Sequence, residues 1–195
     1  MSLKKGEIVG IVGESGCGKS TLLKLLLRFW QKQKGEILYN NIDIDNINTA
    51  SLLNNVTMVS QTTYLFNESI EDNLRIAKQD ATIEEIIEAC ERASIHDLIM
   101  MLPNGYQTVF EDNLSAGENQ RIGLARAFLS GSELILLDEP TSNVDSINEG
   151  MILKSLKQHK HHKSMILVSH RESTMSIADR IYRIEGGRIY EQYSI

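Results

Sequence analysis

The chain has 195 residues, of which 42% are hydrophobic and 24% are charged, and its 20 basic and 26 acidic side chains give a formal net charge of −6 at pH 7. The length favours one domain with a sizeable core. The negative charge argues against nucleic acid as a partner, because nucleic-acid-binding domains are normally basic. The longest apolar run, residues 98–102, is much shorter than the about 20 residues of a membrane-spanning helix. We therefore expect a globular protein that does not cross a membrane.

The N-terminus and the cysteines bear on the cellular compartment. The first residues show no charged segment followed by an apolar stretch, so we expect no secretory signal. Cys17 and Cys90 are the two cysteines. Two are too few for a disulfide framework, which favours a reducing compartment.

The first half of the chain predicts strands and then a block of helices. The apolar run at 8–12 predicts a buried strand, and a Gly-rich loop at 13–18 leads into a leucine-rich helix. Residues 36–39 and 56–59 predict two further strands. From about residue 68 to Pro103, apolar residues recur at helical spacing without a strand pattern, which predicts a helical insertion.

Strand patterns return after this insertion. Residues 134–137 and 165–168 are short apolar runs, and a helix is predicted between them over 146–158. Residues 180–192 predict a hairpin that turns at Gly186-Gly187. Because strands alternate with helices, we expect an α/β fold with a mostly parallel sheet.

Two Ser-x-x-Glu pairs have the spacing of a helix capping box. Ser146 and Glu149 predict one at the start of the helix over 146–158, and Ser115 and Glu118 predict another at the start of a helix near residue 116. A capped helix start presents free N–H groups, which suit a phosphate group.

Residues 13–20, Gly-Glu-Ser-Gly-Cys-Gly-Lys-Ser, match the phosphate-binding loop G-x-x-x-x-G-K-[ST] between a predicted strand and a predicted helix. The glycines let backbone N–H groups turn inward, and the helix adds its positive N-terminal end. We expect the Lys19 side chain to reach the β- and γ-phosphates and the Ser20 hydroxyl to bind Mg²⁺. The alternative, a connector with an incidental lysine, is disfavoured by this context. Cys17 is either a reactive thiol at a helix N-terminus or, as we favour, a small residue in a crowded loop.

Two carboxylates, Asp138 and Glu139, follow the predicted strand at 134–137. We expect this strand to lie beside the phosphate loop. Asp138 is then placed to hold Mg²⁺ through water, and Glu139 to orient or deprotonate a water that attacks the γ-phosphate. Taken alone, an Asp-Glu-Pro turn would be read as a solvated loop, so this interpretation depends on the phosphate loop.

These motifs occur together with residues 114–118, Leu-Ser-Ala-Gly-Glu, which resemble the signature of ABC transporter ATPase domains, usually written LSGGQ. Further matches to this family are Gln61 after a strand (the Q-loop), residues 142–145 (the D-loop) and residues 169–171, Ser-His-Arg (the switch histidine). The six motifs follow the family's order over nearly the whole chain.

The resemblance implies a P-loop NTPase core with a mostly parallel sheet and a helical subdomain inserted in the chain. Residues 1–67 and 131–195 would form the discontinuous core. Residues 68–130 would form the helical subdomain that carries the signature.

The resemblance also implies an ATPase that uses ATP and Mg²⁺. The implied ATP-binding residues are Gly13, Glu14, Ser15, Gly16, Cys17, Gly18, Lys19, Ser20 and Thr21. The implied catalytic residues are Glu139, His170 and Gln61, and the implied Mg²⁺ ligands are Ser20, Gln61 and Asp138. In the family, the signature contacts the γ-phosphate of the ATP held by the opposite subunit; here it comprises Ser115, Ala116, Gly117 and Glu118, and the D-loop contributes Asp145.

Residues 64–74 and 102–109 resemble the exporter branch of the family. The implied function is therefore ATP binding and hydrolysis that drives transport through a head-to-tail dimer, at the cytoplasmic face of the cell membrane. The implied partners are a transmembrane domain, commonly fused to the ATPase, and a second ATPase domain. A non-transport ABC-type ATPase predicts a basic surface and tandem domains, and a regulatory nucleotide-binding module predicts the loss of Glu139 or Lys19.

The sequence departs from the family pattern at three points. Only a short link precedes Leu114 where exporters have the X-loop, and Glu111 is the candidate to replace it. Residues 1–12 leave no room for the family's N-terminal strands and contain no aromatic residue to stack on adenine. We expect that Met1 marks a boundary within a longer coding sequence. Glu118 brings a negative charge to the signature, where the family usually has Gln.

Three histidines lie close together after the predicted helix over 146–158. They suggest either affinity for a metal ion or, as we favour, a solvated polar turn: His159, His161 and His162.

Overall fold

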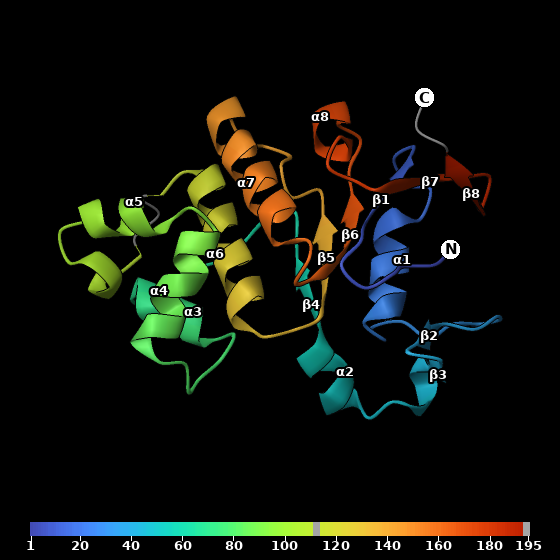
Figure 1. The fold of residues 1–195 in the computed structure, drawn as a ribbon, viewed down its shortest axis with the longest axis horizontal. Helices are drawn as coiled ribbons and strands as arrows, with labels where there is room; N and C mark the ends of the chain where they lie inside the picture. The colour runs from blue at the N-terminus through green and yellow to red at the C-terminus, as the bar shows by residue number, and fades with distance from the viewer. Residues whose placement is uncertain (111–113, 193–195) are drawn as a thin grey trace.

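The structure is a computed structural model that describes residues 1–110 and 114–192. Its main sheet has six strands in the order β4-β5-β6-β1-β7-β8 (Figure 1). All neighbouring pairs are parallel except β7 and β8, which form the predicted hairpin. The expected mostly parallel α/β fold is thus confirmed. The strands are β1 (Ile8–Gly13), β4 (Val56–Val59), β5 (Leu134–Asp138), β6 (Ser164–Val168), β7 (Arg180–Glu185) and β8 (Arg188–Gln192).

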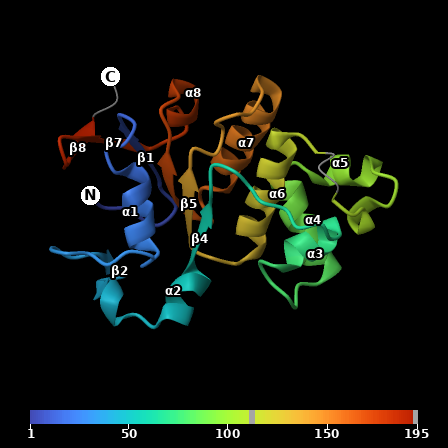
Figure 2. The same cartoon turned by 180° about the vertical axis from the view of Figure 1, so that it is seen from behind.

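Helices cover both faces of this sheet, and Figures 1 and 2 show the molecule from opposite sides. The helices that lie next to the main sheet outside the helical block are α1 (Lys19–Leu26), α2 (Thr49–Asn55), α7 (Ser146–His159) and α8 (Glu172–Met175). The described residues between 70 and 129 contain helices and no strand of the main sheet, as predicted, and these helices are α3 (Ile70–Arg75), α4 (Ile83–Arg92), α5 (His96–Met101), η2 (Gly105–Gln107) and α6 (Ala116–Leu129). Figure 1 shows α3 to α6 gathered at one side of the molecule, away from α1.

The strand predicted over 36–39 is shorter than expected and belongs to a separate two-stranded ribbon. The two strands of this ribbon, β2 (Leu38–Tyr39) and β3 (Ile42–Asp43), pair antiparallel, and the short helix η1 (Ile44–Asn46) follows them. None of the described helices is long and apolar enough to cross a membrane.

Apolar side chains alternate across the main sheet and fill two cores. Ile135 and Leu137 of β5 pack on the side of α6 and α7, whereas Leu134 and Leu136 pack on the side of α1 and α2. Burial of both faces explains why the strands read as continuous apolar runs.

The strand order corrects one expectation about the site. The carboxylate strand β5 does not lie beside β1, because β6 pairs with both of them. The carboxyl ends of β4, β5, β6 and β1 nevertheless meet at one edge of the sheet, since these strands are parallel. Ligands of open α/β sheets bind at this edge.

The second correction concerns the start of α7. Asp145, not Ser146, caps this helix, because its side chain accepts hydrogen bonds from the N–H groups of Ile147 and Asn148. The Glu149 side chain does not bond to the start of the helix but contacts Arg171 and Ser173. By contrast, the capping box predicted at the start of α6 is present: the Ser115 hydroxyl accepts from the Glu118 N–H at 3.3 Å, and the Glu118 carboxylate accepts from the Ser115 N–H at 2.7 Å.

Candidate active site

The phosphate-loop pattern forms a tight turn from β1 into α1. A Cβ atom on Gly13 would lie 2.6 Å from the Ile184 carbonyl oxygen and 2.7 Å from the Cys17 sulfur, so only glycine fits there. Gly18 caps α1 with a φ of 107°, and no side chain of the described residues bonds to the N–H groups of the first turn. Those N–H groups are therefore available to an anion in front of the helix.

The Lys19 side chain folds back over this loop. Its ammonium group donates to the carbonyl oxygens of Gly13 at 2.8 Å and Glu14 at 2.9 Å. Two neutral acceptors hold the cation at the mouth of the loop, where a phosphate oxygen could replace them as a stronger, charged partner.

A cleft of about 550 Å³ lies in front of the loop. It brings together eleven of the residues that the sequence analysis singled out, and these are Gly13, Ser15, Gly16, Gly18, Lys19, Ser20, Thr21, Gln61, Asp138, Glu139 and His170. Glu14 and Cys17 do not line it. Cys17 instead packs against the apolar cluster on the α1 side of the sheet.

The Glu139 carboxylate is held at both oxygens by the segment that follows β6. One oxygen accepts from the Ser169 hydroxyl at 3.3 Å, and the other lies 3.0 Å from Nδ1 of His170. Glu139 has a φ of 50°, a left-handed conformation that costs about 1–3 kcal/mol for such a residue. Its N–H donates to the Val168 carbonyl and its carbonyl accepts from the Ser142 N–H, and these bonds hold the strained conformation.

Asp138 and Gln61 reach the cleft from the ends of β5 and β4. Asp138 is the last residue of β5 and pairs with Val168 of β6. Gln61 follows β4 by two residues and is exposed. With Ser20, these side chains supply carboxylate, amide and hydroxyl oxygens, which are the donor types that Mg²⁺ prefers.

The signature and D-loop residues lie elsewhere. None of Ser115, Ala116, Gly117, Glu118 and Asp145 lines the cleft. They are close to one another, because the start of α6 packs on the start of α7: a Cβ on Gly117 would lie 2.6 Å from Cβ of Asn148. The Asn148 side-chain amide donates to Asp145 at 2.6 Å, and this hydrogen bond is the main reason why the pKa of Asp145 is lowered.

A partly buried ion pair next to His170, between Arg171 and Glu149, was not found from the sequence. Arg171 forms an ion pair with Glu149 at 2.8 Å and donates to the Thr141 carbonyl at 2.6 Å, and the Glu149 carboxylate accepts from the Ser173 hydroxyl at 2.5 Å. This network ties α7 to the segment that carries His170. Only the Ser-His-Arg match pointed to Arg171, and no local pattern linked it to a glutamate on another helix.

Two other predictions concern Glu111 and the three histidines at and just after the end of α7. Glu111 lies outside the described residues. His159 bonds through Nδ1 to the Ser155 carbonyl at 2.8 Å and packs on the ring of Phe128. Within residues 1–110 and 114–192, no three His, Cys, Asp or Glu side chains come close enough together to hold a metal ion.

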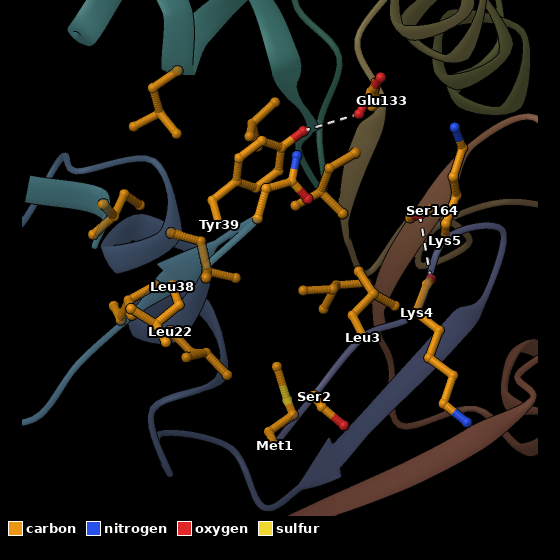
Figure 3. Close-up of a pocket in the computed structure, with 18 of the residues that line it drawn as sticks. Met1, Ser2, Leu3, Lys4, Lys5, Leu22, Leu38, Tyr39, Glu133 and Ser164 are labelled. Atoms are coloured by element: carbon orange, nitrogen blue, oxygen red, sulfur yellow. Dashed lines mark hydrogen bonds between the residues drawn. The ribbon is translucent and has the colours of Figure 1, made fainter. Parts of the chain in front are cut away.

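A second hollow, of about 450 Å³, lies between the N-terminal residues and the β2–β3 ribbon. Figure 3 shows Leu3 and Leu22 on its walls and the Tyr39 hydroxyl directed at Glu133; burial is the main reason why the pKa of Tyr39 is raised. The hollow contacts Leu134 and Ser164, the first residues of β5 and β6. It therefore lies at the opposite end of the strands from the cleft. Among its described lining residues is His162, but none of those predicted to bind ATP or Mg²⁺.

Comparisons with known proteins agree on one family. A family model described as ABC transporter matches residues 1–142. The chain is 59% identical over 192 residues to a "Probable ABC transporter ATP-binding/permease protein" of Haemophilus influenzae, covering 97% of this chain and 35% of that protein. It is 40% identical over 194 residues to multidrug resistance protein pgp-1 of Caenorhabditis elegans, covering 98% of this chain and 15% of that protein.

A solved structure gives the same result. The fold is similar to that of a bacterial Atm1-family ABC exporter with ATP bound, with a TM-score of 0.89 and 35% sequence identity over 96% of this chain and 33% of that chain. The chain thus spans about a third or less of the length of these similar proteins.

Proposed function

The chain belongs to the ABC transporter family, and from that premise we propose that it is the ATPase unit of an exporter, which binds ATP–Mg²⁺ in the cleft and hydrolyses it to drive transport by a membrane domain. The observation that carries this proposal is the cleft itself. It unites the Lys19 ammonium and the free N–H groups of α1 with the carboxylates of Asp138 and Glu139 and the imidazole of His170. Such a set serves phosphoryl transfer to water, where positioning and charge stabilisation do most of the work.

Each part of the cleft has a role in this proposal. Lys19 and the first turn of α1 bind the β- and γ-phosphates. Ser20, Gln61 and Asp138 hold Mg²⁺, which when bound neutralises charge on the phosphate oxygens. Glu139 orients the attacking water and accepts its proton at a carboxylate oxygen, and His170 contacts the γ-phosphate.

The signature acts on the nucleotide of a second ATPase domain in a head-to-tail dimer. Its distance from the cleft of its own chain supports this assignment, as does the start of α6: within the described residues, the N–H groups of Ala116 and Gly117 have no hydrogen-bond partner. The Glu118 carboxylate is occupied by the Ser115 N–H, so its charge is directed at the helix end. A capped helix start with two free donors suits a γ-phosphate.

The wider architecture belongs to the same proposal. Residues 1–67 and 131–195 form the nucleotide-binding core, and residues 68–130 form a helical subdomain. The unit works at the cytoplasmic face of the cell membrane, joined to a transmembrane domain. The names of the similar proteins, which combine ATP-binding and permease functions or refer to multidrug resistance, support a fused membrane domain.

Titration of the chain with ATP–Mg²⁺ by calorimetry tests the binding site. Lys19→Ala should weaken binding about 10- to 100-fold, because it removes hydrogen bonds to a charged group that are worth about 1.5–3 kcal/mol. Lys24→Ala is the matched control, since Lys24 lies on the same helix, outside the cleft, over the ring of Trp30. Equal losses in the two variants would contradict the assignment of the cleft.

A further inference from the structure

The segment that carries Gln61 is held by one side chain of α6. Gln120 is 3% exposed. Its amide nitrogen donates to the Ser60 carbonyl at 2.9 Å, and its amide oxygen accepts from the Thr63 hydroxyl at 3.0 Å. One buried amide therefore anchors the backbone before Gln61 and the side chain two residues after it.

Two further residues of α6 hold the same segment. A Cβ on Gly123 would lie 2.3 Å from the Thr63 hydroxyl oxygen, so the helix surface is in direct contact with Thr63. Arg126 donates to the Tyr64 carbonyl at 2.7 Å and is partly buried, and this burial lowers its pKa. Within the described residues, the Gln61 side chain has no hydrogen bond of its own. The backbone is thus held before and after Gln61, whereas the Gln61 side chain itself can reach into the cleft.

We propose that Gln120 is a positioning residue for Gln61, and that it sets the Mg²⁺-dependent part of ATP binding by holding Ser60 and Thr63 in place. This inference rests on the proposed function, because it takes Gln61 as a ligand of Mg²⁺. It also makes α6, which is capped by Ser115 of the signature, the element that positions Gln61 at the cleft. Groups that orient metal ligands typically change metal affinity 10- to 100-fold when they are removed.

Two variants of Gln120 test the proposal. Gln120→Leu leaves the Ser60 carbonyl and the Thr63 hydroxyl without partners. Gln120→Glu keeps the shape and an acceptor for Thr63 but loses the donor to Ser60, so it remains informative if the leucine variant folds poorly. ATP affinity is measured by calorimetry with Mg²⁺ and with EDTA. We expect each variant to lower the Mg²⁺-dependent gain in ATP affinity at least tenfold, while the affinity in EDTA stays within about twofold.

A purely structural role is separated by a control and by a double variant. Ser155→Ala removes another buried hydrogen bond, to the Arg92 carbonyl, and should change neither affinity. In a Gln61→Ala background, Gln120→Leu should have no further effect on the Mg²⁺-dependent gain, because residues that act as a unit are not additive. An additive loss, or equal losses with Mg²⁺ and with EDTA, would overturn the proposal. Absence of ATP binding by the unmodified chain would instead overturn the proposed function.

Discussion

Nδ1 of His170 lies 3.0 Å from a carboxylate oxygen of Glu139, across the carboxyl ends of β5 and β6. Glu139 is mostly covered, with 15% of its side chain exposed, whereas 68% of His170 is exposed. An ionised carboxylate can only accept hydrogen bonds, so in a hydrogen bond between the two side chains Nδ1 of the ring is the donor. Movement of His170 away from Glu139 would release this Nδ1 donor for a γ-phosphate. The same movement would free one Glu139 oxygen for water.

Replacement of the signature serine tests the role of a second copy. Ser115→Arg should leave ATP binding by a single chain within about twofold, because Ser115 does not line the cleft. ATP hydrolysis should fall sharply, since a bulky cation would block the γ-phosphate of the partner from reaching the start of α6. Ser115→Ala is the matched control: it loses the cap, at a cost of about 1 kcal/mol, but keeps the free N–H groups.

The dependence of hydrolysis on protein concentration completes this test. Under the proposed dimer mechanism, the rate should rise faster than linearly with concentration. A constant specific activity over a wide dilution series, for a protein shown to be monomeric, would contradict the dimer.

The two cysteines should differ strongly in reactivity. Cys90 is fully buried, and burial raises the pKa of its thiol to about 12. At pH 8 only roughly 10⁻⁴ of it is thiolate. Cys17 is partly exposed in the phosphate loop. A thiol reagent should therefore label the native chain at Cys17 alone, and ATP–Mg²⁺ should slow that labelling.

Mass spectrometry of the labelled chain reads out this prediction. Cys17→Ser should remove the native labelling, and Cys90 should react only after denaturant is added. Comparable labelling rates of both thiols in the native chain would show that the packing around Cys90 is wrong.

An ion pair between Glu7 and Arg180, at the amino ends of the neighbouring strands β1 and β7, should make the stability of the fold depend on pH. Glu7 accepts hydrogen bonds from Arg180 at 2.5 and 3.1 Å, and the hydrogen bond from Arg180, against an opposing effect of burial, lowers the pKa of Glu7. Its pKa in the folded state is thus below that in the unfolded chain. The pair therefore stabilises the fold above the unfolded pKa, and this contribution is lost as pH falls through the folded pKa.

Urea unfolding at several pH values measures this effect. Glu7→Gln should lower the free energy of unfolding near neutral pH and flatten its decrease between about pH 5 and about pH 3. The exposed Glu36→Gln is the control and should leave the pH profile unchanged. An unchanged profile in Glu7→Gln would show that the pair does not contribute.

The sequence predicted those features that local pattern determines. The strands of the sheet are buried on both faces, so they appear in the sequence as continuous apolar runs. The backbone of the phosphate loop requires glycine at Gly13 and Gly18, so the loop is recognisable as a sequence pattern. Strand order was not predictable in this way: β6 lies between β5 and β1 because of pairing between residues far apart in the chain, such as Met165 with Ile8 and Ile135.

The helix caps show the same limit at the scale of one residue. Ser115-x-x-Glu118 and Ser146-x-x-Glu149 have the same spacing, yet only the first forms a capping box. Glu149 is instead held by Arg171 and Ser173, and Asp145 is an equally good cap one residue earlier. Contacts with residues outside the helix therefore determine which of the two Ser-x-x-Glu pairs forms a capping box. The hydrogen bonds of Gln120 to Ser60 and Thr63 were invisible from the sequence for the same reason.

The most direct test of the account is the rate of phosphate release by Glu139→Gln. Glutamine keeps the shape of the side chain but not the basic carboxylate. ATP–Mg²⁺ should still bind, because Lys19, Ser20 and Asp138 are unchanged, and phosphate release should slow roughly 10²–10⁴-fold, the usual contribution of a general base. Phosphate release at a near-normal rate would remove Glu139 from the catalytic role and contradict the assignment of the cleft chemistry.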